Sequence, residues 1–470
     1  MNDSDHQTQA PGSLQPLRQL VGDGVAVPCI DGIERPYLSC DAAASTAALE
    51  AVLARVEEFL PWYSSVHRGA GFKSRRATDA YEAARAAALH FAGRTPEGDV
   101  AIICRNTTEA INHLVYRLGL EPDDVVVTTV VEHHANLLPW SRAARCRYVE
   151  CSDDGTFDTS DVVAALDSRP APRLLAITGA SNISGWMPPL EEITSAAHER
   201  GVPVVVDGAQ LAPHRPLPRG ADFVAWSGHK MYAPFGAGVL IGPRTAFSEG
   251  DPFLAGGGAV DLVDLDEVEW TEPPEREEAG SPNVIGAVAL HAAADELEEI
   301  GWATVSEHDR HLSRLLRSGL ASIPGLRLLG PGPETETLPV ATFVVEAMAH
   351  SLVAARLSAE AAVGVRHGCF CAHPYLMRLL GLRREEVQAF RDQVRAGDRS
   401  KMPGAVRASL GINAGEADVA RLCDAVRRVV TTPPDVAYRQ DTASGDYFPD
   451  GPDGFWLTPP EPHSATCSPG

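Results

Sequence analysis

Lysine is almost missing from this chain of 470 residues, whose basic charge comes nearly all from arginine. The only lysines are Lys73, Lys230 and Lys401. Chemistry that needs a side-chain amine, such as covalent attachment to a carbonyl compound, must therefore use one of these three residues.

Several other signals are missing as well. No apolar run reaches the ~18 residues that a membrane-spanning helix needs. No GxGxxG follows a predicted strand, and neither GxxxxGK followed by Ser or Thr nor GxSxG occurs. The sequence thus lacks the patterns of dinucleotide-binding proteins, P-loop nucleotide hydrolases and nucleophile-elbow hydrolases.

Positive charge is also scarce, with 40 Lys and Arg against 63 Asp and Glu and a formal net charge of −23. Nucleic acids and anionic membranes need a basic face, so we expect neither as a partner. A small anion can still bind in a local positive pocket. Residues 1–12 are polar and carry acids, unlike a secretory or transit peptide, and this predicts a cytoplasmic protein.

The nine cysteines are odd in number and widely spread, which argues against a secreted disulfide framework. Only Cys369 and Cys371 lie close together. No second Cys or His pair with zinc-ligand spacing accompanies them, so no metal site is expected.

Short apolar runs alternate with helical segments between residues 99 and 240, and this pattern is typical of a parallel sheet covered on both faces. The runs are 99–104, 124–131, 174–178, 202–206, 221–226 and 238–241. Helical spacing predicts helices over 45–60, 76–92, 286–300 and 301–321. In such sheets the ligand binds beyond the carboxyl ends of the strands.

The remaining organisation follows from composition. We expect an arm over residues 1–35, a large α/β domain over 36–300 and a smaller α+β domain over 301–430, with strands near 326–329 and 341–345. The Pro-rich, acidic tail 431–470 is expected to be extended or poorly ordered. The aromatic residues of the tail that could dock on a surface are Tyr447, Phe448, Phe455 and Trp456.

Polar residues follow the first two runs. After residue 104, Thr107 or Thr108 is a good N-cap, and a helix start with hydroxyls beside it can bind phosphate; a plain capping motif explains the same residues. After residue 131 comes Glu132-His133-His134-Ala135-Asn136. His133 could stack on a flat ring, bind a metal or be an ordinary hydrogen-bonded loop histidine.

Asp207 follows the strand Val204-Val205-Val206 and needs a partner there. The protonated ring nitrogen of pyridoxal phosphate is one such partner, and a metal ion or a helix N-terminus is another. Lys230 follows the next strand, 23 residues later. One flat ligand could therefore meet a carboxylate at one end and an amine at the other, whereas the alternative is an exposed lysine in a Gly-rich loop.

These segments, in this order, resemble the class V aminotransferases, pyridoxal-phosphate enzymes of fold type I, and most closely their group II cysteine desulfurase and selenocysteine lyase branch. The resemblance covers about 37–430. Its segments are Tyr37-Leu38, Val66-His67-Arg68-Gly69, Thr107-Thr108-Glu109, Glu132-His133-His134-Ala135-Asn136, Ser181-Asn182, Asp207-Gly208-Ala209-Gln210, Ser227-Gly228-His229-Lys230, Ala279-Gly280-Ser281-Pro282-Asn283, Arg366, Cys371-Ala372 and Arg407-Ala408-Ser409. It implies a mostly parallel, seven-stranded sheet with flanking helices and a smaller C-terminal α+β domain.

The resemblance also implies a pyridoxal 5′-phosphate site. Its residues would be Thr107, Thr108, His133, Asp207, Gln210, Ser227, His229 and Lys230, with Ser281 supplied by the second subunit of a homodimer. Lys230 would hold the cofactor covalently and Asp207 would pair with the ring nitrogen. His133 would stack on the ring and is, with Lys230 and Cys371, one of the three residues expected to be catalytic. Gln210 would contact the phenolic oxygen. The phosphate would lie among Thr108, Ser227 and His229.

Substrate contacts and the nucleophile follow from the same resemblance. Asn182 and Arg407 would hold the substrate carboxylate, and Arg366 belongs to the same active-site loop. A guanidinium fork suits a carboxylate. Cys371 would be the catalytic thiol, which takes sulfur from a cysteine-like substrate as a persulfide, leaves alanine and passes the sulfur to an acceptor.

One departure concerns the residues before Cys371. The common group II pattern has two histidines there, whereas this chain has Cys369 and Phe370. The Gly-Cys-Phe-Cys run is more similar to the desulfurase domain of molybdenum cofactor sulfurases. Cys369 could resolve the persulfide as a disulfide, or it could be an inert buried thiol.

Three hypotheses remain at this point. The first is a cysteine desulfurase or related C–S lyase. The second is an enzyme of the same fold that does not use Cys371, such as an amino-acid epimerase or a lyase acting on a larger cysteine conjugate. The third is a non-catalytic scaffold or sulfur-relay partner, which the presence of Lys230 and Asp207 disfavours.

Overall fold

The computed structural model describes residues 14–450. The predictions for residues 1–13, Phe455 and Trp456 lie outside this range. Within it, no helix is both long and apolar enough to cross a membrane. The predicted boundaries between arm, domains and tail stay predictions.

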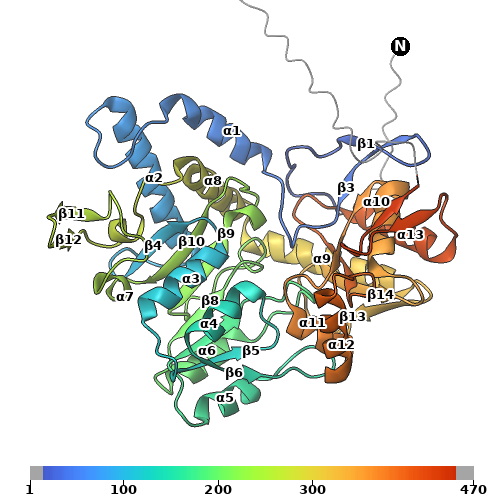
Figure 1. Cartoon of the computed structure of the whole chain (residues 1–470). Helices are drawn as coiled ribbons and strands as arrows, with labels where there is room; N and C mark the ends of the chain where they lie inside the picture. The colour runs from blue at the N-terminus through green and yellow to red at the C-terminus, as the bar shows by residue number, and fades with distance from the viewer. Residues whose placement is uncertain (1–13, 451–470) are drawn as a thin grey trace, which may run out of the picture.

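A seven-stranded sheet forms the centre of the larger part of the molecule (Figure 1). Its strands are β4 (Asp99–Cys104), β5 (Val125–Thr129), β6 (Arg145–Val149), β7 (Leu174–Thr178), β8 (Val204–Asp207), β9 (Phe223–Ser227) and β10 (Gly238–Pro243). The strand order is β4-β10-β9-β8-β7-β5-β6, and β10 alone runs antiparallel to its neighbours. The mostly parallel, seven-stranded sheet is thereby confirmed.

Helices cover both faces of this sheet, which explains why its central strands are apolar throughout. Successive side chains of a strand point to opposite faces. Val204 and Val206 accordingly pack into one cluster and Val205 into another. The first face is covered by α2 (Phe72–Phe91), α5 (Thr159–Asp167), α6 (Leu190–His198) and α8 (Val284–Ile300), and the second by α3 (Thr107–Leu118), α4 (Leu138–Ala143) and α7 (Thr245–Ser248).

Edge strand β6 was not predicted, because it lacks the apolar run that marks the others. Its sequence alternates Arg145, Cys146, Arg147 and Tyr148 before the buried Val149. An edge strand with a solvent-facing side needs no continuous apolar sequence.

The smaller part contains a four-stranded antiparallel sheet in the order β13-β14-β17-β16. Its strands are β13 (Leu326–Leu329), β14 (Val340–Val345), β16 (Arg366–Gly368) and β17 (Ala405–Ser409). The helices here are α9 (Trp302–Ala321), α10 (His350–Ala361), α11 (His373–Leu379), α12 (Arg384–Arg395) and α13 (Glu416–Thr431). β17 places Arg407 at the edge of the larger part, and the segment after β16 carries Cys371.

The N-terminal segment packs on this smaller part before the chain enters α1 (Glu50–Phe59). β1 (Ala26–Pro28) pairs with β2 (Glu34–Pro36), and β3 (Leu38–Ser39) runs parallel to β15 (Val363–Gly364). Short elements complete the fold. They are η1 (Leu60–Trp62), η2 (His134–Asn136), η3 (Gly228–Lys230), β11 (Val260–Val263), β12 (Val268–Trp270) and η4 (Glu275–Glu277).

The described part of the tail is folded, contrary to the expectation of an extended or poorly ordered segment. β18 (Tyr438–Gln440) and β19 (Tyr447–Pro449) form a hairpin. Tyr438 donates to Glu360 across 3.0 Å, and Ser351 donates to the Gly445 carbonyl across 3.0 Å, which ties the hairpin to α10. These side-chain contacts hold the hairpin in place, although the Pro-rich composition of the tail predicted an extended or poorly ordered segment.

Candidate active site

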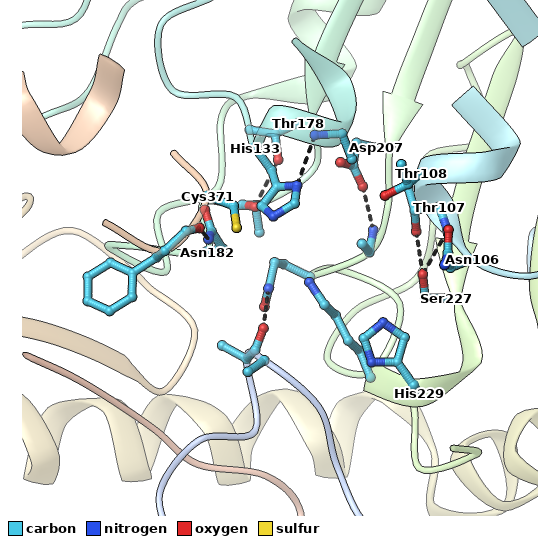
Figure 2. Close-up of a pocket in the computed structure, with 18 of the residues that line it drawn as sticks. Asn106, Thr107, Thr108, His133, Thr178, Asn182, Asp207, Ser227, His229 and Cys371 are labelled. Carbon is cyan, nitrogen blue, oxygen red and sulfur yellow. Dashed lines mark hydrogen bonds between the residues drawn. The ribbon is translucent and has the colours of Figure 1, made fainter. Parts of the chain in front are cut away.

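A cavity of about 250 Å³ lies beyond the carboxyl ends of the parallel strands, where the strand pattern predicts a ligand site. Figure 2 shows side chains from both parts of the molecule facing it. All predicted site residues except one line this cavity. They are Thr107, Thr108, His133, Asn182, Asp207, Gln210, Ser227, His229, Lys230, Arg366, Cys371 and Arg407.

Ser281 is the exception, since it is exposed on the loop before α8 and does not line the cavity of its own chain. This placement is the one that the resemblance implied, in which a second subunit supplies the residue. The dimer itself stays a prediction.

One end of the cavity is built from the start of α3 and the end of β9. The cap of α3 is Asn106, whose Oδ1 accepts the Glu109 N–H across 3.0 Å, so the prediction of Thr107 or Thr108 as the cap was wrong. The helix begins at Thr107, and Thr107 N–H and Oγ1 lie 2.8 and 2.7 Å from Ser227 Oγ. The hydroxyls of Thr107 and Ser227 and the positive end of the helix thus meet at one point, which suits an anion.

Gly238 makes this junction possible. A Cβ atom at that position would lie 2.7 Å from the Asn106 Cα atom, closer than real Cβ contacts allow. The glycine therefore lets β10 pass directly beside the start of α3. His229 follows Ser227 on η3, and burial lowers the pKa of its imidazole to about 4. His229 is hence a neutral hydrogen-bonding group near neutral pH.

Asp207 ends β8 in the middle of the cavity and is 4% exposed. Its Oδ1 accepts the Ala209 N–H across 3.0 Å, and no hydrogen bond from a described residue reaches Oδ2. Burial raises the pKa of this carboxyl, while the Ala209 N–H and the Lys230 amine oppose the shift. A cationic N–H on a ligand would supply the partner that this carboxylate lacks.

Lys230 ends η3, which follows β9, and its amine reaches the same cavity. Burial lowers its pKa to about 8; the Asp207 carboxylate opposes this change and the Arg407 guanidinium adds to it. A substantial fraction of the amine is therefore uncharged at neutral to mildly basic pH, as a nucleophilic amine requires.

His133 is held over the cavity by the turn that precedes η2. Its Nδ1 accepts the Ala135 N–H across 3.1 Å, and burial, with the charges of Lys230 and His134, lowers its pKa to about 3. A neutral imidazole with a fixed ring plane suits stacking on an aromatic ligand better than it suits proton transfer.

Glu132 lies beneath this turn, fully buried, and sequence reasoning assigned it no role. Its oxygens accept from Thr129 Oγ1 (2.7 Å), Asn136 Nδ2 (2.7 Å) and the Thr178 N–H (3.0 Å). Burial raises its pKa to about 8, against the effect of these donors. The network fixes the ends of β5 and β7 to each other and so fixes the turn that carries His133.

Gln210 lies after β8, and its Nε2 donates to the Ala43 carbonyl across 2.7 Å. This bond draws the segment at Ala43 and Ala44 onto the cavity wall, where both residues line the site. The amide of Gln210 is buried and its orientation is fixed by that contact.

Arg407 is 2% exposed and lies at the cavity wall. Its Nη2 donates to Asp41 Oδ1 across 2.9 Å and its Nη1 to the Asn182 carbonyl across 3.0 Å, while its Nε is buried without a partner in the described residues. Burial lowers its pKa to about 10, so it stays cationic near neutral pH. An unpaired donor on a buried cation favours an anionic ligand.

Asp41 also binds the exposed Arg366, whose Nη2 lies 2.9 Å from Asp41 Oδ2. No sequence signal marks Asp41, because it lies 325 positions from Arg366 and no local motif links the two residues. One carboxylate thus holds two arginines beside the cavity.

Cys371 lies on an exposed turn at the mouth of the cavity. Figure 2 shows its sulfur on the same side as His133 and Asn182. Phe370 and Cys371 both have φ near +53°, which side-chain-bearing residues rarely adopt. Asn182 Nδ2 donates to the Phe370 carbonyl across 2.7 Å, so the two predicted residues Asn182 and Cys371 lie on contacting segments.

Cys369 is buried behind this turn. Its thiol donates to the Pro403 carbonyl across 3.0 Å, and burial raises its pKa to about 12. The environment of Cys369 supports the inert alternative over a resolving role.

The donors present fit pyridoxal 5′-phosphate. A hydroxyl-rich helix start would hold the phosphate, a buried carboxylate with a free oxygen would face the ring nitrogen, and a buried amine of lowered pKa would meet the aldehyde. The fold and this set of residues define a pyridoxal-phosphate enzyme of fold type I.

Comparison with known proteins agrees with this class. The family model Aminotransferase class-V matches residues 38–422, and the chain belongs to this family, whose members depend on pyridoxal phosphate. Cysteine desulfurase of Dickeya dadantii is 36% identical over 357 residues, with 73% of this chain and 85% of that protein covered.

Two further proteins are similar. Probable cysteine desulfurase 1 of Mycobacterium leprae is 37% identical over 357 residues, and the match covers 73% of this chain but 57% of that protein, so this chain spans little more than half of its length. The solved apo structure of cysteine desulfurase from Thermococcus onnurineus NA1 has a TM-score of 0.74 and 30% identity, and covers 84% of this chain and 94% of that chain.

Proposed function

We propose that this protein is a pyridoxal-phosphate-dependent cysteine desulfurase that converts L-cysteine, or a related thiol amino acid, to alanine and keeps the sulfur on Cys371 as a persulfide. The observation that carries this proposal is the exposed Cys371 thiol at the mouth of the cavity that contains Lys230 and Asp207. The cysteine desulfurases to which the chain is similar support it.

The cofactor, when bound, withdraws electrons from the substrate Cα atom. Asp207 favours a protonated ring nitrogen, because a carboxylate stabilises a nearby cation. His133 presents a neutral ring face, and the start of α3 with Ser227 and His229 would hold the phosphate. These residues orient the cofactor and do not change during the reaction.

Lys230, with a pKa of about 8, takes a proton from the substrate Cα atom and can return one. Arg407, with Asn182 beside it, binds the substrate carboxylate through charge-assisted hydrogen bonds. With the carboxylate fixed there and the amine directed to the cofactor, the substrate side chain extends toward Cys371.

The sulfur transfer balances without an added oxidant. The Cys371 thiol loses its proton, its sulfur bonds to the substrate sulfur and the substrate Cβ–S bond breaks. The carbon fragment gains protons at Cβ and Cα and leaves as alanine. The terminal sulfur of Cys371 then passes to an acceptor thiol, which restores the enzyme.

We further propose a homodimer, because Ser281 is exposed away from its own cavity and is free to complete that of a second subunit. We also propose that the chain is divided into a large domain, a small domain and a tail. A cytoplasmic location and a protein that accepts the sulfur belong to the same proposal. Sedimentation that shows a fully active monomer would contradict the shared site.

The direct test is alanine formation from L-cysteine by the wild-type protein, Cys371→Ala and the control Cys146→Ala, which removes a partly buried thiol of edge strand β6. Alanine from the wild type and Cys146→Ala, with loss in Cys371→Ala, is the expected result. Full activity of Cys371→Ala contradicts the assigned nucleophile, and exchange of the Cα proton without alanine favours an epimerase or a lyase that acts on larger conjugates.

A further inference from the structure

The turn that carries Cys371 is attached to the segment that carries His133. The backbone N–H of His134 donates to the Cys371 carbonyl across 2.7 Å. The ring of His134 stacks on that of His373, with centroids 5.0 Å apart and planes 5° from parallel. His134 therefore contacts the chain at Cys371 and again two residues later.

The contacts between the two histidines depend on the protonation state of the His134 ring. The His373 N–H donates to His134 Nε2 across 3.3 Å, so this nitrogen carries no proton. His373 Nδ1 lies 3.2 Å from the same nitrogen and can donate to it in the tautomer that carries its proton on Nδ1. Protonation of His134 Nε2 breaks the bond from the His373 backbone N–H, whereas the contact between the rings can persist with His134 as the donor.

The turn needs such support. Phe370 and Cys371 have φ near +53°, and backbone of this kind persists where surrounding contacts hold it. Asn182 holds one end through the Phe370 carbonyl, and His134 holds the other end. At His134 the backbone bond to Cys371 does not titrate, and the contacts of the His134 ring with His373 are the ones that a proton can change.

We propose that His373 is a positioning residue which, paired with His134, forms a latch that holds the Cys371 turn against the segment carrying His133. The effect of this latch on catalysis rests on the proposed function. The latch itself is a property of the turn and can be measured without turnover.

The latch is closed at neutral and basic pH and opens in acid. Burial lowers the pKa of both histidines below the ordinary ~6.5, so both are neutral at pH 7. The nearby titratable groups are Cys371 and His133, whose ring centroid lies 6.3 Å from that of His134. On the same helix as His373, Arg378 is paired with Glu150. Protonation of His134 removes the acceptor of the His373 backbone N–H, and protonation of both rings places two positive charges side by side.

Alkylation of Cys371 by iodoacetamide, followed by peptide mass mapping, measures the latch. The variants are His373→Ala, which removes the ring, and His373→Asn, whose amide can replace Nδ1 as a donor. The control is His291→Ala, which removes a partly buried histidine of α8. At pH 8 we expect Cys371 to be alkylated several-fold faster in His373→Ala, and at the wild-type rate in His373→Asn and His291→Ala.

The pH dependence separates a latch from a general loss of structure. The ratio of the His373→Ala rate to the wild-type rate cancels the thiolate fraction. It should fall toward one in acid, as the pH falls through the lowered pKa of His134 and the wild-type latch opens. In alanine formation, His373→Ala should lower kcat and leave both KM and the visible absorbance of the bound cofactor unchanged.

Equal alkylation rates in wild type and His373→Ala, a ratio that does not change with pH, or no rescue by His373→Asn would overturn the latch. If the alkylation results hold and the wild type makes no alanine from L-cysteine, the latch stands and the proposed function fails. If alanine forms and the alkylation rates are equal, the function stands and the latch fails.

Discussion

Asp41 and Arg407 form a hydrogen-bonded ion pair, 2.9 Å between Oδ1 and Nη2, at the cavity wall, although 366 positions of sequence separate them. Asp41 comes from the N-terminal segment and Arg407 from β17 of the smaller part. The pair fixes the plane of a buried guanidinium whose Nε has no partner in the described residues. It therefore orients the group that we assign to the substrate carboxylate.

Replacing Asp41 by alanine should weaken substrate binding. Arg407 loses a charge-assisted hydrogen bond worth ~1.5–3 kcal/mol, which also orients its guanidinium. A less firmly oriented guanidinium binds the substrate carboxylate more weakly, so we expect KM for L-cysteine to rise about tenfold. Asp31→Ala, which breaks an exposed ion pair with Arg35, is the control and should leave KM unchanged. Steady-state kinetics that show an unchanged KM for Asp41→Ala would contradict this role.

The lowered pKa of Lys230 predicts how cofactor attachment depends on pH. The neutral amine reacts with an aldehyde, so the rate of attachment should rise with pH and level off above about 8. Asp207→Asn removes the carboxylate that raises this pKa and should shift the midpoint of the rise to lower pH. Stopped-flow absorbance after addition of pyridoxal phosphate measures both profiles, and a midpoint near the ordinary lysine pKa is the contrary result.

Glu132 is expected to matter for stability. Glu132→Ala leaves the donors of Thr129, Asn136 and Thr178 without their acceptor in a buried site, and we expect the free energy of unfolding to fall by about 3 kcal/mol. Glu192→Ala, on the exposed side of α6, serves as the control. Urea unfolding followed by tryptophan fluorescence gives both values, and similar midpoints for the two variants would contradict the network.

Cys369 is expected to take no part in sulfur transfer. Its thiol is buried and bonded to the Pro403 carbonyl, and its pKa of about 12 leaves almost no thiolate at pH 8. Cys369→Ala should keep alanine formation within about twofold of the wild type, because the thiolate is the reactive form. Mass mapping of the wild type during turnover should find no Cys369–Cys371 disulfide; accumulation of this disulfide would support a resolving thiol.

Local sequence signals were sufficient for much of the fold and of the site. The buried strand β7 and the half-buried edge strand β13 were predicted to the residue, because their apolar runs are continuous or alternate cleanly. Asp207 and Lys230 were found because they follow such runs directly. Edge strand β6 has no comparable run, and the tail hairpin depends on contacts with α10 that composition does not reveal.

Long-range partners account for the rest of the site. Asp41 reaches Arg407 only through the tertiary fold, and Glu132 acts through Thr178, which lies 46 positions away. The N-cap of α3 is Asn106 and not Thr107 or Thr108, although all three have capping side chains, because Asn106 Oδ1 accepts the Glu109 N–H. The bonds of Asp41 to Arg407 and of Glu132 to Thr178 leave no local spacing in the sequence, whereas the cap of α3 does, since Asn106 and Glu109 are three positions apart.

Covalent attachment of pyridoxal phosphate to Lys230 is the central claim, and borohydride reduction of the reconstituted protein followed by peptide mapping tests it most directly. Our account predicts a reduced pyridoxyl label on Lys230 and none on the exposed Lys73 and Lys401. A label on Lys73 or Lys401, or no label at all, would contradict the active site described here.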